Sequence, residues 1–88
     1  MLSINDAMLL SNTLSGYRVY RQETGATSYF QYLDSEGDFY VLKSVLSGAV
    51  TTYTYARKRD QVTAEQVIDT AWTNRATLVY SRFDEAFG

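Results

Sequence analysis

The sequence predicts an α+β domain that is mostly β, with a four-stranded antiparallel meander and one helix of the C-terminal half packed on it. Three observations lead to this fold class. Aromatic residues make up 15% of the 88-residue chain, and eight of them are Tyr, which favours half-buried pleated surfaces. Three turn signals containing Gly divide residues 17–57 into four runs. An amphipathic segment with a helix-start signature then follows over residues 63–73.

The turn signals predict how neighbouring strands pair. Each places a Gly where the chain needs a positive φ, and the middle one begins with Asp, as a type I turn with a following bulge prefers. We expect two-residue loops at the first and third turns, and Asp34 to pair with Asp38 across the middle one. The signals are Glu23-Thr24-Gly25-Ala26, Asp34-Ser35-Glu36-Gly37 and Leu46-Ser47-Gly48-Ala49, with the two loops at Thr24-Gly25 and Ser47-Gly48.

Counting outward from these turns predicts which side chains share a face, because a slip of one residue exchanges the two faces. One face collects aromatic and aliphatic side chains and is the predicted core. Its cross-strand rows are Tyr17, Tyr32, Tyr40 and Tyr55, then Val19, Phe30, Leu42 and Tyr53, then Arg21, Ser28, Ser44 and Thr51.

The opposite face is mixed, and we expect it to be partly wet. Apolar spots at its two ends are candidates for contact with a partner. Its rows are Tyr20, Tyr29, Lys43 and Thr52, then Arg18, Gln31, Val41 and Thr54, and the end pairs are Leu33 with Phe39 and Val45 with Val50.

A helix is predicted over residues 64–73. Thr63 can cap this helix, and Gln66 can complete a capping box with it. Val62 and Val67 occupy the positions of a hydrophobic staple. We expect its apolar stripe to cover the tyrosine-rich face, with Trp72 contributing most. Residues 76–83 read as a final strand that the meander can accept. The stripe is Ala64, Val67, Ile68, Ala71 and Trp72.

The chain divides into an N-terminal arm, residues 1–15, and a single small β-rich domain with a C-terminal tail, residues 16–88. For the arm, the sequence allows either a helix or an extended segment. The apolar side chains of the arm and of the tail can dock on a neighbouring chain or complete the core of their own chain. The candidate core is Tyr17, Val19, Phe30, Tyr32, Tyr40, Leu42, Tyr53, Tyr55, Val67, Ile68 and Trp72. The candidate interface is Met8, Leu9, Leu10, Leu14, Tyr20, Tyr29, Leu33, Phe39, Phe83 and Phe87.

Composition argues against catalysis and cofactors. The chain has no Cys and no His, which removes thiol nucleophiles, imidazole bases and most transition-metal sites. Asp34, Glu36 and Asp38 alternate as in a calcium loop, but Val45 holds the twelfth position, where an EF-hand needs Glu. We therefore expect no catalytic, metal or cofactor site and no enzyme activity.

Charge and hydropathy restrict the partners. A net charge of −2 supplies no field for nucleic acid, and the basic run over residues 57–59 reads as a solvated connection. No stretch approaches the ~20 apolar residues of a membrane span, and the first residues lack a secretory signal. We expect a protein made in the cytoplasm that binds neither nucleic acid nor membrane.

The segment Ala71-Trp72-Thr73-Asn74-Arg75-Ala76-Thr77-Leu78-Val79-Tyr80 resembles a motif of short virion- or tail-associated proteins of tailed bacteriophages, of the form Trp, Asn/Asp, Asn, Arg, Ala, x, Leu, x, Tyr. Those proteins carry an earlier Gly-Asp turn and aromatic strands, at places that residues 34–40 and 51–56 occupy here. The resemblance covers roughly the last two thirds of the chain and implies a structural protein of the virion. Without it, the segment reads as a helix-to-strand corner in which Asn74 takes the left-handed conformation and Arg75 binds freed carbonyls.

The expected function is that of a non-enzymatic, multi-copy structural subunit of a phage particle, attached to capsid, neck or tail and contacting other virion proteins and copies of itself. Two alternatives stay open. One is a small phage module that inhibits a host protein. The other is an attachment module that contacts glycans through Tyr20 and Tyr29.

Overall fold

The described chain is a four-stranded antiparallel sheet with helices on both faces. A computed structural model describes residues 16–88, so the predicted arm with Met8, Leu9, Leu10 and Leu14 lies outside it. The sheet order β1-β2-β3-β4 confirms the predicted meander. Its strands are β1 (Arg18–Glu23), β2 (Thr27–Leu33), β3 (Phe39–Ser47) and β4 (Val50–Arg57).

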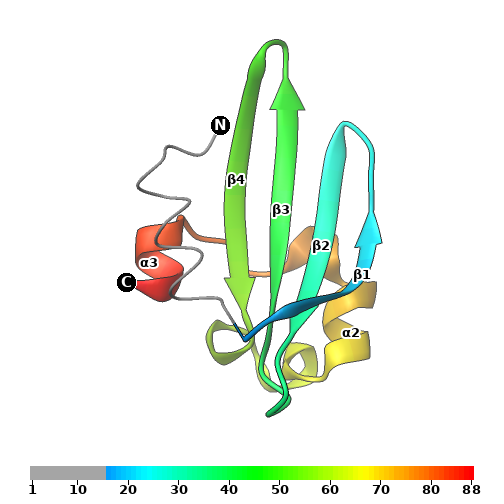
Figure 1. The fold of residues 1–88 in the computed structure, drawn as a ribbon, viewed down its shortest axis with the longest axis vertical. Coiled ribbons are helices and arrows are strands. Elements are labelled where there is room, and N and C mark those ends of the chain that lie inside the picture. The colour runs from blue at the N-terminus through cyan, green and yellow to red at the C-terminus, as the bar shows by residue number, and fades with distance from the viewer. Residues whose placement is uncertain (1–15) are drawn as a thin grey trace.

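Short helical pieces make up the C-terminal half (Figure 1). In place of the expected final strand, residues 76–83 make a single bridge, between Ser81 and Tyr55. The pieces are 3₁₀ helices at Lys58–Asp60, Thr63–Gln66 and Arg75–Thr77 and α-helices α2 (Ile68–Thr73) and α3 (Phe83–Phe87).

The helix predicted over residues 64–73 is interrupted at Val67, whose backbone is extended (φ −86°, ψ 127°). Thr63 makes no cap hydrogen bond, and Gln66 Nε2 instead donates to the carbonyl of Gln61 at 3.1 Å. Val62 and Val67 are both mostly exposed. The predicted capping box is therefore wrong, because Gln66 is used to fold the preceding loop.

The middle turn is as predicted, and the third is shifted. Asp34 N donates to Asp38 O at 3.0 Å, and Tyr32 lies opposite Tyr40. The β3–β4 loop is Gly48-Ala49, one residue later than expected, and Gly48 has φ +62°. That positive φ at the first loop position is typical of a type II′ turn. Tyr40 therefore faces Arg57 instead of Tyr55, although the same side chains still share a face.

The first turn is wider than predicted, and β1 contains a bulge. Ser28 Oγ bonds both the N–H and the carbonyl of Gly25, each at 3.1 Å. Pairing shifts between Val19 and Arg21, so one extra residue is inserted at Tyr20. As a result, Arg21 lies opposite Gln31 and on the other face from the one predicted.

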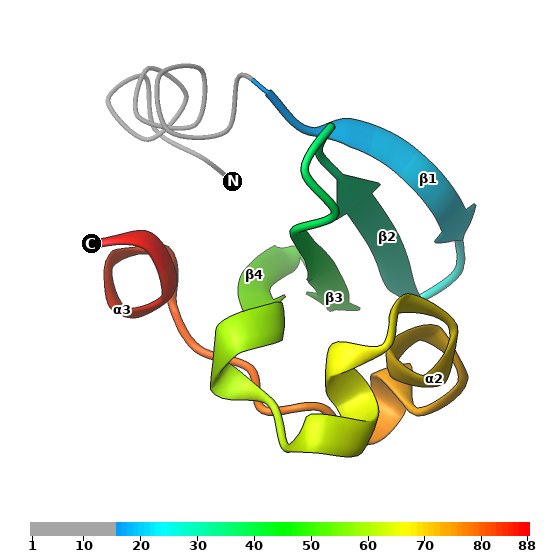
Figure 2. The ribbon, with the colours of Figure 1, turned by 90° about the horizontal axis from the view of Figure 1, so that it is seen from below.

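The two faces of the sheet have separate covers, and Figure 2 shows α2 below the β1–β2 side and α3 beside β4. We call the side that carries Tyr32, Tyr40 and Tyr55 the tyrosine face. Its core cluster includes Phe83, Ala86 and Phe87 of α3. The opposite side, here called the helix face, packs against α2 and the segment after it. Its buried members are Phe39, Val41, Ala56, Ala71 and Leu78.

The predicted pairing of helix and face is therefore wrong. The segment that ends near Trp72 covers the helix face, and the tail covers the tyrosine face. The reason is that both faces are apolar, so that α2 can bury Ala71 and Ile68 against Val41 while the rings of α3 pack on Tyr40 and Tyr55.

Most of the predicted core is buried or half-buried, with two exceptions. Val19 and Val67 are 51% and 56% exposed, because one precedes the bulge and the other stands at the helix break. Trp72 is half-buried on the side of the helix face. The remaining candidates are Tyr17, Phe30, Tyr32, Tyr40, Leu42, Tyr53, Tyr55 and Ile68, of which Tyr40 and Tyr55 are buried.

Candidate protein-contact surface

Exposed apolar side chains gather at the end of the β3–β4 hairpin. This hairpin rises beyond the β1–β2 hairpin and beyond both helices (Figure 1). Leu46 and Val50 flank its turn and are 55% and 65% exposed. An apolar tip that projects from the packed layers is available to a partner surface.

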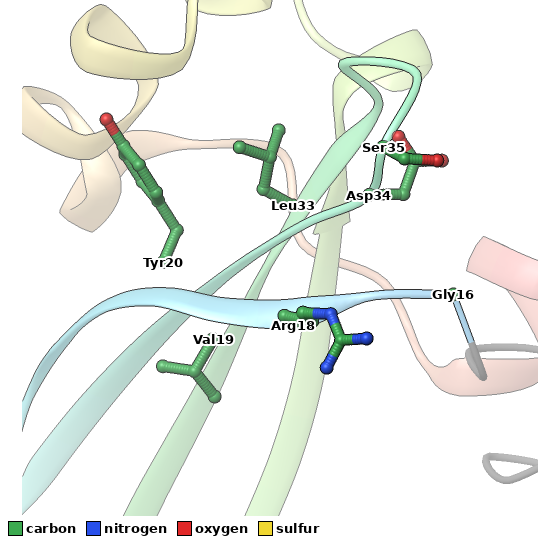
Figure 3. A pocket seen from close by; sticks show the side chains of 7 residues that line it. All are labelled: Gly16, Arg18, Val19, Tyr20, Leu33, Asp34 and Ser35. Atoms are coloured by element: carbon green, nitrogen blue, oxygen red, sulfur yellow. The ribbon is translucent and has the colours of Figure 1, made fainter.

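A second exposed region surrounds the bulge in β1. An open pocket of about 460 Å³ lies there, and Tyr20 and Leu33 point to one side of β1 while Val19 points to the other (Figure 3). The guanidinium of Arg21 lies 4.5 Å from the centre of the Tyr20 ring. The bulge and the side chains of Arg18 and Arg21 protect this edge of the sheet from pairing with another strand. The pocket is lined by Gly16, Arg18, Val19, Tyr20, Leu33, Asp34 and Ser35.

The candidate interface residues of the described chain fall into two groups. Tyr20 is 51% exposed and open to a partner. Phe39 is 2% exposed, and Tyr29 and Leu33 pack beside it in the core of the helix face. For Phe39 the predicted partner contact is wrong, because the helical layer of the same chain covers it. Tyr29 and Leu33 are half-buried, and Leu33 also lines the open pocket.

The tail is docked on its own domain. The Phe83 ring lies 5.6 Å from the Tyr55 ring, and the Phe87 ring lies 5.2 Å from that of Tyr40. Arg57 Nη1 and Arg59 Nη2 donate to the carbonyl of Ala86 at 3.3 and 3.0 Å. Phe83 and Phe87 are therefore committed to the fold, contrary to their prediction as interface residues.

The basic run thus has a structural use that sequence reasoning missed. Besides binding the end of α3, Arg57 Nη2 lies 3.3 Å from Asp38 Oδ2 and its guanidinium stands 4.7 Å from the centre of the Phe87 ring. Tyr17 OH donates to the same carboxylate of Asp38. Burial, together with this hydrogen bond, raises the pKa of Tyr17 to about 12. Burial also raises the pKa of Tyr40.

On the helix face, arginines join β1 and β2 to the helical layer. Arg75 pairs with Glu23 at 2.9 Å, and its guanidinium lies 4.6 Å from the centre of the Trp72 ring. Its Nη1 also donates to Trp72 O at 2.8 Å, which confirms the predicted bond to a helix-end carbonyl. Asn74, at φ −99°, does not take the left-handed conformation predicted for it.

Two buried glutamines were also missed, because their burial depends on tertiary structure. Gln31 is fully buried, and its Nε2 donates to Ile68 O at 2.9 Å, so the helix face is dry at this position instead of wet. The amide of Gln61 bonds both N and O of Val79, at 2.8 and 2.9 Å. An amide side chain thus replaces the neighbouring strand that residue 79 would otherwise need.

The acidic turn is engaged in its own folding. Asp34 Oδ1 accepts from the N–H groups of Glu36 and Asp38 at 2.9 and 2.8 Å. Over residues 16–88 no group of three potential metal-ligating side chains converges. In the same range, no helix is long and apolar enough to cross a membrane.

Comparison with known protein families, with curated proteins and with solved structures finds no match to the chain.

Proposed function

We propose that the chain is a non-enzymatic structural subunit of a tailed-phage particle, present in several copies and acting through contacts with other virion proteins and with itself. The observation that carries the proposal is the exposed apolar tip of the β3–β4 hairpin. Leu46 and Val50 lie beside the turn of this hairpin, whose end lies beyond both covers of the sheet (Figure 1). Burying the exposed part of these two side chains, which are 55% and 65% exposed, contributes roughly 2–4 kcal/mol to an interface.

The size of the domain supports an assembly role. A domain of this length buries about 60–65% of its unfolded surface, and its two small cores lie on opposite faces of one sheet. Small domains without disulfides commonly gain stability by association. The resemblance of residues 71–80 to phage structural proteins is the reason for preferring a virion over other assemblies.

Quantitative mass spectrometry of particles made by the virus that encodes the chain tests this function. We expect the chain in purified particles at a fixed ratio to the major capsid or tail protein. Its absence from washed particles, together with capture of one host protein at equal stoichiometry, would instead support the inhibitor. For the glycan alternative, Tyr20 lines the pocket whereas Tyr29 is packed in the core, so no observation favours that function.

A further inference from the structure

The tyrosine face is longer than its cover. Over residues 16–88, α3 is the element from outside the sheet that joins the tyrosine-face core, and it packs mainly on β4. Its five residues span about 7 Å along the helix axis, whereas the nine residues of β3 span about 30 Å. Leu42 and Tyr53 pack against that core from within the sheet, and Phe30 lies beside Leu42, so these three half-buried side chains continue the aromatic face away from α3.

This uncovered end carries no charge. Pairing places Phe30 beside Leu42 and Ser44 beside Tyr53, and Leu46 extends the same row to the hairpin tip. The helix face, by contrast, carries Lys43 between Tyr29 and Thr54. An apolar, uncharged surface of this kind is suited to an apolar, nearly uncharged occupant.

One segment of the chain fits that description and begins beside the face. Residues 1–15 contain a single charged side chain, Asp6, and apolar side chains at eight positions. They join the described domain next to Tyr17, whose ring lies 5.0 Å from that of Tyr40. From Tyr40 to Leu46 along β3 is about 20 Å, and fifteen residues span about 22 Å as a helix or about 50 Å extended.

We infer that residues 1–15 lie on the uncovered end of the tyrosine face of their own chain, against Phe30, Leu42 and Tyr53. The sequence allows the arm to dock on a neighbouring chain or on its own chain, and its attachment beside Tyr17 favours its own chain. A short tether gives the arm an effective concentration in the millimolar range at its own face, and a neighbouring molecule has to compete with that. The inference does not depend on the proposed function.

A nitroxide label on the arm tests this placement, because the chain has no Cys and a Ser11→Cys variant carries a single thiol. The readout is paramagnetic broadening of amide signals in the full chain. We expect the signals of Phe30, Leu42 and Tyr53 to lose most of their intensity. A matched label from Ser35→Cys, in the β2–β3 turn, lies about 16 Å along the strands from the row of Phe30 and Leu42 and about 23 Å from that of Tyr53. It should broaden Phe30 and Leu42 less than the arm label does and leave Tyr53 nearly unchanged, and a second arm label from Asn5→Cys repeats the measurement.

Mixing isotopes separates the possible occupants. In a sample of unlabelled spin-carrying chains and ¹⁵N chains without the nitroxide, we expect no broadening at these three residues. Broadening in the mixture would assign the arm to a second copy, and no broadening in either sample would leave the face without the arm. Either result overturns the inference. A Leu9→Asp/Leu10→Asp variant should abolish the same-chain effect, whereas Asn12→Asp should retain it.

Discussion

At the scale of single residues, the carboxylate of Asp38 and the guanidinium of Arg57 join three parts of the chain. Tyr17 precedes β1, Asp38 follows the β2–β3 turn and Arg57 ends β4, and Arg57 reaches onward to Ala86 of α3. The side chain of Arg57 is 17% exposed. Hydrogen bonds between charged groups in such partly desolvated sites are worth more than those of exposed pairs.

Replacement of this arginine should therefore loosen the tail. For Arg57→Gln we expect the free energy of unfolding to fall by about 2 kcal/mol, because charge-assisted bonds and the contact with Phe87 are lost. Urea titration followed by circular dichroism measures the change. Arg82, at 75% exposed, is the control, since Arg82→Gln should cost about 0.5 kcal/mol or less. Equal midpoints for the two variants would remove Arg57 from this role.

The raised pKa of Tyr17 makes stability depend on alkaline pH. The phenol keeps its proton in the folded protein up to about pH 12, whereas the unfolded chain releases it near pH 10. Between those values the folded state binds more protons, so the free energy of unfolding falls as pH rises. Below pH 10 this contribution is fully present. Urea midpoints at pH 9, 10 and 11 should decline less steeply for Tyr17→Phe than for the parent, and parallel declines would contradict the assignment.

At the scale of elements, the sequence predicts the strands and the shared faces but not what covers each face. Tyr32, Tyr40 and Tyr55 share one face as predicted, because the pairing of β4 with β3 is shifted by two residues and an even shift keeps side chains on the same face. The bulge at Tyr20 is different, since one extra residue exchanges the faces beyond it. No local signal distinguishes that residue from its neighbours in β1.

The covers depend on long-range fit. The stripe of residues 64–73 is amphipathic, but its small Ala71 fits against Val41, and Gln31 finds its partner in the carbonyl of Ile68. Residues 76–83, which resemble a strand by composition, make a single bridge at Ser81. The residues that follow form α3, whose two Phe rings pack on tyrosines from separate strands. For the candidate site, the sequence predicts that Tyr20 is available to a partner. It does not predict the exposed hairpin tip, because that exposure depends on how far the helices extend along the sheet.

Removing one ring from α3 should weaken the tyrosine face. Phe87→Ala deletes contacts with Tyr40, Tyr55 and Arg57, and we expect a loss of about 2 kcal/mol, below the range for fully buried Phe because this ring is half-exposed. Guanidinium unfolding gives the value. Asp84→Ala, on the exposed side of the same helix, should change stability by about 0.5 kcal/mol or less. Similar losses for both variants would count against docking through the rings.

The β3–β4 turn depends on a glycine. Gly48 has φ +62°, and a Cβ there would meet no atom within 4 Å, so the cost of Gly48→Ala is conformational and about 1–2 kcal/mol. Gly25 lies in the first turn without a positive φ, and Gly25→Ala should leave stability unchanged or slightly higher. Thermal unfolding of both variants tests the difference, which should vanish if the hairpin adopts another turn.

At the scale of the whole molecule, a single sheet with two separate covers leaves its longest hairpin unsupported. Charged side chains of the described domain stabilise the fold. Arg57 and Arg59 bind the end of α3, and the carboxylate of Asp34 holds the middle turn. The exposed apolar tip has no such use within residues 16–88. This contrast is the reason for proposing a protein that works by contact with other proteins.

Self-association is the most direct test of that claim. Sedimentation velocity of the full chain from about 1 to 100 μM covers the affinities expected of a modest interface. We predict a discrete oligomer that a Leu46→Thr/Val50→Thr variant converts to monomer with an unchanged circular dichroism spectrum, while Val62→Thr, at another exposed valine, leaves the oligomer intact. A parent chain that stays monomeric throughout, or an oligomer indifferent to the hairpin variant, would contradict the account.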